Sequence, residues 1–347
     1  MPIDTAALKD KMQEVAEREL GPGKRSGDHV NHACPFVAEK TPGAFTVYSD
    51  HFKCFSCGIS GDVITFIQML NKVSFQEACQ QLGAGTTDFE AIALYRQERE
   101  VARIKAEQEK KDARLAYNDS KKWQEYHFAL DTASRERWRQ WGIPDSFQNW
   151  WKLGYAPDRQ YEVNEQLYHT TAYVMPIWSF PNGVVSSVMT SQFRLTNPVE
   201  GAGKFRFERG LGTAAFITRN DWEAGKTAKG DAMCLVVEGP RKAATARIKV
   251  GGDDLQIIGI PSKLDTGGVL ESLKLYAWVY VWLDPDVRVP PPKAPSTWEA
   301  ADVKLCKAIG VDKSSYIRYG EKIDDALLSG HLDKNMVMRL MRQSESV

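Results

Sequence analysis

The stretch that decides the fold of the N-terminal part is His32–Phe66, HACPFVAEKTPGAFTVYSDHFKCFSCGISGDVITF. Cys34 stands alone, and twenty residues later Cys54 and Cys57 form a C-x-x-C pair. Such a pair in a tight turn places two thiolates on one side of a tetrahedral zinc ion, and a distant cysteine supplies a further ligand. The apolar residues between the cysteines alternate, which predicts a β-hairpin. The pattern therefore predicts a zinc ribbon.

The fourth zinc ligand stays open at this level. His32 lies two residues before Cys34, so both side chains point to the same face if this segment is a strand. His51 lies three residues before Cys54 and is the second candidate. A site with three cysteines, or one completed by water, is the remaining alternative. We take His32 as the first candidate.

Length, charge and cysteine content limit the kinds of protein that this chain can be. Its 347 residues suggest two to three domains, and the formal net charge of zero means that contacts with nucleic acid must come from local basic patches. The three cysteines outside the cluster, among six in total, fit buried small hydrophobic residues in a reducing compartment better than a disulfide framework. No signal peptide and no long apolar run is present, so we expect a cytoplasmic protein without membrane contact.

Four segments follow from the changes in pattern. Residues 1–85 hold the zinc ribbon between a helix at 4–20 and two helices that begin after Asp62 and Ser74. Residues 86–130 are rich in charges of both signs, which predicts a solvated helical linker, with a DNA-tracking basic helix as the alternative.

Residues 131–230 begin with a tryptophan-rich segment, RERWRQWGIPDSFQNWWKLGYAP at 135–157, which predicts core helices; stacking on nucleic-acid bases is the alternative. Strand-like runs follow at 173–179, 183–189 and 205–208, with a hairpin turn at 181–183. Residues 231–347 alternate continuous apolar strands with helices, which predicts a parallel sheet buried on both faces. The fold class is thus a multidomain α+β chain.

Acidic residues stand where two of the predicted parallel strands end. Glu238 closes CLVVE, and Asp284 and Asp286 follow VYVWL. Functional groups gather at the carboxyl ends of parallel strands, and hard carboxylate oxygens suit Mg²⁺. Two such ions can clamp the attacking and leaving oxygens of a phosphoryl transfer. Ser262 and Lys263 end the strand between them in the sequence.

The ordered set of motifs resembles the DnaG-type bacterial and phage DNA primases over nearly the whole chain. CPFVAEKTPGAF and HFKCFSCGISGDVITFI are similar to their CHC2 zinc-binding domain. WGIPDSFQNWWKLGYAPD, MPIWSFPNGVVSSVMTSQFRL and GKFRFERG look like the N-lobe of their RNA polymerase core. VVEGPRKAATA, GIPSKLDTG and VWLDPD look like three strands of a Toprim domain.

The resemblance implies synthesis of short RNA primers on single-stranded DNA from nucleoside triphosphates. It implies that Glu238, Asp284 and Asp286 bind Mg²⁺ or Mn²⁺, and that Arg194 and Lys204, with Arg206 as a further candidate, contact phosphates. Asp324 and Asp325 fall in a partial match to the acidic motif that closes the Toprim part, or else cap the helix that they begin. Since the chain has no Walker A motif, we expect a separate replicative helicase as partner.

Two positions depart from the family pattern. Val37 stands where the first zinc knuckle has histidine, and Lys242 stands four residues after Glu238, where bacterial primases often have an acid. These departures motivate one alternative, a relative that binds single-stranded DNA without synthesis. A Toprim nuclease or topoisomerase-like enzyme is the weaker alternative, because no separate module with a nucleophilic tyrosine is recognisable.

Overall fold

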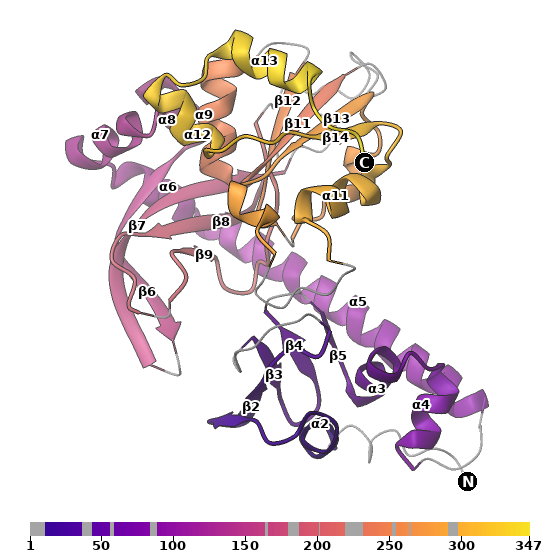
Figure 1. Ribbon diagram of the computed structural model, residues 1–347. Coiled ribbons are helices and arrows are strands. Elements are labelled where there is room, and N and C mark those ends of the chain that lie inside the picture. The colour runs from indigo at the N-terminus through magenta and orange to yellow at the C-terminus, as the bar shows by residue number, and fades with distance from the viewer. Residues whose placement is uncertain are drawn as a thin grey trace. The chain divides into compact units, whose positions relative to one another are not determined.

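The chain divides into two compact units in a computed structural model (Figure 1). One unit comprises Met1–Ala106 with Val289–Glu299, and the other comprises Glu107–Arg288 with Ala300–Val347. Each unit is considered by itself below. The structure describes residues 11–36, 44–55, 59–83, 89–163, 166–179, 187–200, 202–218, 232–251, 255–263, 265–290 and 298–347.

The first unit contains the predicted zinc-ribbon region. An antiparallel sheet runs in the order β1-β2-β3-β4-β5. The β3–β4 hairpin that the alternating apolar residues predicted is present, with Phe45 paired to Cys54. The elements are β1 Lys24–Ser26, β2 His29–His32, β3 Phe45–Val47, β4 Phe52–Cys54, β5 Ser60–Gly61, α2 Met12–Leu20, α3 Val63–Asn71 and α4 Phe75–Gln81.

The helix starts of this unit follow the predicted caps. The Asp62 carboxylate accepts the backbone N–H of Thr65 at the start of α3. Ser74 and Glu77 form a reciprocal capping box at the start of α4. The predicted beginning of the first helix at residue 4 lies outside the described residues. Interlocking Phe36, Phe45, Phe52 and Phe66 rings form the centre of the core.

Helices α5 (Phe89–Ser120) and α6 (Lys122–Phe128) occupy the segment expected to be a solvated linker. The expectation is wrong for its second half, which belongs to the second unit from Glu107 onward. The buried Tyr117 hydroxyl lies 2.8 Å from Ser191 Oγ, and the Arg114 guanidinium donates to the carbonyls of Met189 and Leu211. Positions 114 and 117, three residues apart, lie on one helix face, and this face packs rather than meeting water.

The second unit begins with helices and an antiparallel sheet of order β6-β7-β8-β9. The elements are α7 Thr132–Gln140, α8 Asp145–Trp151, β6 Gly154–Val163, β7 Gln166–Trp178, β8 Val188–Leu195 and β9 Phe205–Phe207. Trp138, Trp141 and Trp151 are buried as predicted, whereas Trp150 is 48% exposed. The turn predicted at 181–183 lies outside the described residues.

The second sheet of this unit has the order β10-β12-β11-β13-β14, and all its pairs are parallel except β10 with β12. Helices α9, α12 and α13 cover one face, and α11 lies on the other (Figure 1). The remaining elements are β10 Phe216–Ile217, β11 Met233–Glu238, α9 Pro240–Val250, β12 Leu255–Ile260, α10 Leu270–Leu273, β13 Trp278–Trp282, the 3-10 helix η3 Pro285–Arg288, α11 Ala301–Ile309, β14 Ser314–Tyr316, α12 Ile323–Ser329 and α13 Lys334–Arg342.

Both faces of the parallel sheet are buried, as the continuous apolar strands predicted. Along β11, Leu235 and Val237 pack in one core while Cys234 and Val236 pack in the other. The core on the α9 face also contains Met175 and residues of α7 and α8, so the antiparallel and parallel sheets of this unit share it. Within the described part of the chain, no helix is long and apolar enough to cross a membrane.

Gly259 marks the tightest contact of this sheet with α9. A Cβ atom at Gly259 would lie 2.7 Å from the Gly239 carbonyl oxygen and 3.0 Å from the Ala243 Cβ, both at the start of α9. Gly259→Ala is expected to lower the free energy of unfolding by about 1–3 kcal/mol through overpacking, measured by urea denaturation. Gly320→Ala is the control, because nothing lies within 4 Å of a Cβ there. Equal stabilities of the two variants would contradict this packing.

Candidate functional site

The three acidic residues predicted as metal ligands lie at one edge of the parallel sheet. The register pairs Glu238 of β11 with Ile260 of β12, and Val237 with Trp282 of β13. Asp284 follows β13 by two residues, and Asp286 lies in η3. The carboxyl ends of the three parallel strands therefore bring these side chains to a common edge.

Each of the two aspartates faces an ammonium group. Asp284 is buried, with Oδ1 2.5 Å from the Lys242 Nζ and Oδ2 3.1 Å from the Lys322 Nζ. Asp286 is exposed, and its Oδ2 lies 3.6 Å from the Lys263 Nζ. Lysine cations thus already occupy both oxygens of the buried aspartate. In the parts of the chain that the structure describes, no group of three His, Cys, Asp or Glu side chains is arranged to hold a metal ion.

Glu238 has a carboxylate oxygen that accepts no hydrogen bond. Its Oε2 is buried and has no hydrogen-bond partner. Burial raises the pKa of this carboxyl above its usual range, the negative charge of Asp284 raises it further, and Lys242 opposes them. A buried acceptor without a donor is what a cation would satisfy, so these residues fit a divalent ion.

The acidic pair near the C-terminus belongs to α12 rather than to the end of a strand. Asp324 in the first turn of α12 is fully buried, and its Oδ2 lies 2.6 Å from the Arg241 Nη2. Asp325 is exposed. Neither residue caps the helix, since Lys322 holds the N-cap position and no side chain makes a cap hydrogen bond there. Asp324 serves as counterion of an arginine.

That arginine belongs to a cluster around Trp141, which we call the arginine cluster: Arg137, Arg194 and Arg241. Their guanidinium carbons lie 5.1, 4.2 and 5.5 Å from the centre of the Trp141 ring, within the range of cation–π attraction. The Trp141 side chain is buried. The backbone carbonyl of Trp141 accepts a hydrogen bond from the Thr245 hydroxyl of α9. Elements α7, β8 and α9 thus converge on one aromatic ring.

The arginine cluster has more positive charge than its surroundings neutralise. The pKa of the Arg194 guanidinium is lowered to about 10, mainly by burial and then by the positive charges of Arg241 and Arg137. The Arg194 Nε is buried without a hydrogen-bond partner. The charge of Arg194 also lowers the pKa of Lys204, which lies just before β9. Like charges held together with an unused donor form a site that an anion would stabilise.

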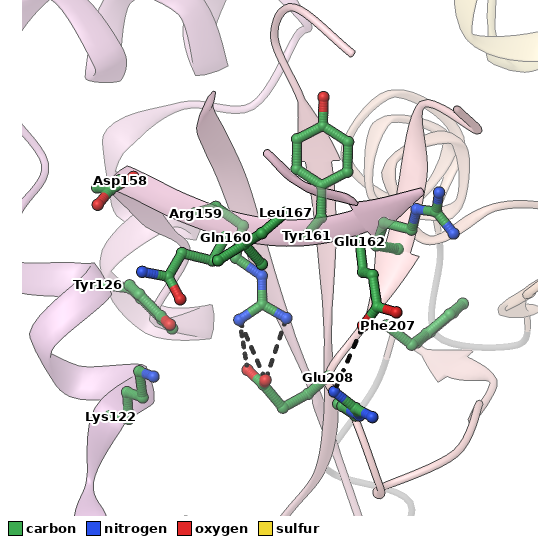
Figure 2. Close-up of a pocket in the computed structure, with 12 residues that line it drawn as sticks. Lys122, Tyr126, Asp158, Arg159, Gln160, Tyr161, Glu162, Leu167, Phe207 and Glu208 are labelled. Atoms are coloured by element: carbon green, nitrogen blue, oxygen red, sulfur yellow. Dashed lines mark hydrogen bonds and ion pairs between the residues drawn. The ribbon is translucent and has the colours of Figure 1, made fainter. Parts of the chain in front are cut away.

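Arg206 lies on the other face of the antiparallel sheet. The β8–β9 register pairs Arg206 with Phe193 and Arg194 with Phe205, so the two arginines point in opposite directions. Figure 2 shows the pocket on the Arg206 side, a cavity of about 820 Å³ between α6, β6 and β9.

Most charges in this pocket are already paired. The Arg159 guanidinium donates to both oxygens of Glu208, as the dashed lines in Figure 2 show, and lies over the Phe193 ring. The Arg209 Nη1 lies 3.8 Å from Glu162 Oε2. This pocket therefore offers an anion less unneutralised charge than the arginine cluster does.

The zinc-ribbon region holds its described cysteines in the core. Cys34 and Cys54 are buried in the same hydrophobic cluster, and the Cys54 N–H donates to the Ile59 carbonyl, which closes the turn after β4. Cys57 and Val37 lie outside the described residues. Two buried thiols in the same cluster are of the residue type that binds zinc.

The two candidate histidines lie in different surroundings. His32 is buried, its Nε2 has no hydrogen-bond partner, and burial lowers the pKa of its imidazole, which favours the neutral form that binds metals. The His32 ring lies next to Gly23, which precedes β1. Cys54 lies in the other direction along the sheet, in β4, two strands from the β2 strand that carries His32. His51 is at the exposed tip of the β3–β4 hairpin, stacked on Tyr48 and 2.7 Å from Asp50.

Sequence reasoning missed Arg137, Arg241 and Lys322 as members of these two clusters. Arg137 lies inside the tryptophan-rich segment, and Arg241 follows Glu238 by three residues. A charged residue on a helix carries no sign of which strand it will face, so only the packing assigns them.

The arginine cluster predicts a specific anion-binding effect. Arg194→Gln is expected to weaken binding of inorganic tripolyphosphate about ten- to hundredfold, because it removes a charge-assisted contact of about 1.5–3 kcal/mol. Isothermal titration calorimetry measures this affinity. Arg206→Gln is the matched control on the opposite face of the same sheet and should leave it unchanged. An equal loss in both variants would contradict the assignment.

The similarity to known proteins is strongest in the N-terminal part of the chain. Residues 3–95 match the CHC2 zinc finger family of DnaG-type zinc ribbons. The DNA primase of Mycolicibacterium smegmatis is 40% identical over 83 residues, which cover 23% of this chain and 13% of that protein. The DNA primase of Lactococcus lactis is 30% identical over 167 residues, which cover 45% of this chain and 25% of that protein.

The chain thus matches at most about a quarter of the length of these two relatives. Among solved structures, the zinc-binding and RNA polymerase domains of the Aquifex aeolicus primase align with 100% of this chain and 87% of their own, at 18% identity and a TM-score of 0.47. The family match and the sequence relatives together confirm the resemblance of this chain to the DnaG-type DNA primases, carried foremost by the CHC2 zinc finger at residues 3–95.

Proposed function

We propose that this chain is a DNA primase that synthesises short RNA primers on single-stranded DNA. The observation that carries the proposal is the meeting of Glu238, Asp284 and Asp286 at one sheet edge, with Arg241 of the arginine cluster in the first turn of α9, directly after β11. The similarity to DNA primases supports the reaction class.

In this proposal the parallel sheet is a Toprim-type domain spanning 231–347, and 131–230 is the N-lobe of the polymerase core. Divalent cations bound at the three carboxylates would hold the nucleoside triphosphate and favour in-line attack of a 3′-hydroxyl on its α-phosphorus. Arg194 and Lys204, with Arg137 and Arg241, would bind phosphate oxygens of the nucleotide or the template. Trp141 contacts three of these cations, and the Arg194 Nε is buried.

The zinc-ribbon region over 1–85 would engage the single-stranded template. We propose that Cys34, Cys54, Cys57 and His32 hold its zinc ion; the buried Nε2 of His32 without a partner supports the histidine, which must turn away from Gly23 to reach the ion. A replicative helicase would act as a separate partner.

A second candidate function is binding of single-stranded DNA without synthesis. The observation that favours it is the ion pair of Lys242 with Asp284, which places a cation of the protein on a carboxylate that the reaction would need. Nuclease activity is a third possible function, and the experiment below distinguishes it from the other two.

Primer synthesis tests the proposal directly. The wild type is expected to make oligoribonucleotides from labelled nucleoside triphosphates with Mg²⁺ on single-stranded DNA of several sequences, analysed on denaturing gels. Asp284→Asn should lower the rate by about two orders of magnitude or more, since it removes a carboxylate from the reaction centre. Asp119→Asn, an exposed position on α5, is the control.

DNA binding without products from the wild type would establish the binding function instead. Cleavage of DNA in the absence of nucleotides would establish a nuclease.

Zinc content tests the N-terminal site. Cys54→Ser is expected to release zinc, because a tetrahedral thiolate site loses most of its affinity with one ligand. His32→Ala should lower zinc affinity, measured by competition with a chelator, whereas His51→Ala should leave it unchanged. Unchanged affinity in both histidine variants would exclude both as ligands and leave a site of three cysteines.

A further inference from the structure

The feature that distinguishes the acidic edge of the parallel sheet is the number of lysines in contact with it. Asp284 has both oxygens within 3.1 Å of ammonium groups, Lys242 on one side and Lys322 on the other. Asp286 lies 3.6 Å from a third ammonium, that of Lys263. Three lysine charges therefore balance the three carboxylates before any divalent ion binds.

Lys242 differs from the other two lysines in how it is held. Its side chain is 13% exposed, against 49% for Lys322 and 41% for Lys263. It projects from the first turn of α9, directly after the buried Pro240 and the Arg241–Asp324 ion pair. Because the Lys242 stem is largely buried, this lysine cannot move away from Asp284 without leaving the Oδ1 of a buried carboxylate unpaired, which is costly; Lys322 contacts only the other oxygen, Oδ2.

Glu238 and Asp286 differ from Asp284 in that neither is held between two lysines. The Glu238 Oε2 is buried without a hydrogen-bond partner. Asp286 is exposed, and its Oδ2 lies 3.6 Å from the Nζ of the part-exposed Lys263. A hard divalent cation binds oxygen ligands of this kind and repels a nearby ammonium.

We propose that the ammonium of Lys242 takes the place of one of two divalent cations, so that the centre binds a single divalent cation through Glu238 and Asp286. This inference rests on the proposed function, which identifies the three carboxylates as a metal centre. It concerns the number of divalent cations bound there and the role of Lys242. Lys242 is then a positioning residue: it neutralises Asp284 and fixes that carboxylate for the bound ion.

Counting bound Mn²⁺ tests this inference without reference to activity. The full chain, loaded with zinc, is titrated with Mn²⁺ alone, and the free ion is followed by electron paramagnetic resonance. The wild type should bind one Mn²⁺ that Glu238→Gln abolishes. Lys242→Met, which keeps an unbranched side chain one atom shorter and removes its charge, should bind two, both dependent on Glu238.

Lys249→Met is the matched control, an exposed lysine two turns further along α9, and should bind one. Lys242→Gln replaces Lys242→Met if the latter fails to fold, as judged by circular dichroism. Two Glu238-dependent ions in the wild type, or one in the Lys242 variant, would overturn the inference and leave the proposed function standing. No Glu238-dependent Mn²⁺ in any variant would overturn both the inference and the metal centre of the proposed function.

Discussion

The parallel register of β11 with β12 and β13 is the constraint on which the candidate centre depends. It makes three strands end at the same level, so that Glu238 and the two aspartates after β13 share one edge. Gly239, at a φ of 91°, then turns the chain directly into α9, and Gly259 leaves room for its carbonyl. A side chain at Gly259 would push the helix away from the strands, whereas at Gly239 it would meet open space but strain the backbone at this positive φ.

The two charged residues in the first turn of α9 contact different groups. Successive helical side chains differ by about 100° in direction. Arg241 accordingly reaches Asp324 and the Trp141 ring, while Lys242 reaches Asp284. An acidic edge and a cationic cluster thus lie side by side, anchored by one helix and one shared hydrophobic core. This is the arrangement that a triphosphate with bound cations requires, since its phosphates need positive partners and its metal ions need negative ones.

Much of this was predictable because it depends on local pattern. Continuous apolar strands ending in acids predicted the parallel sheet and its edge, and the caps at Asp62 and Ser74 predicted two helix starts. The packing of α5 was not predictable, because Tyr117 is buried by a sheet far away in the sequence. Opposite directions for Arg194 and Arg206 follow from strand alternation, but only once the β8–β9 register is known. The partners of Lys242 and Arg241 likewise depend on long-range contacts.

The double contact of Asp284 with Lys242 and Lys322 also constrains how this sequence can diverge. A descendant that acquires an acid at position 242 places two carboxylates together and loses one of the two lysines that contact Asp284. Substitutions at 242, 284 and 322 are therefore expected to occur in concert, with the sum of their charges conserved or compensated by a bound ion. Position 249, on the same helix but remote from the acids, is free of this coupling and can drift.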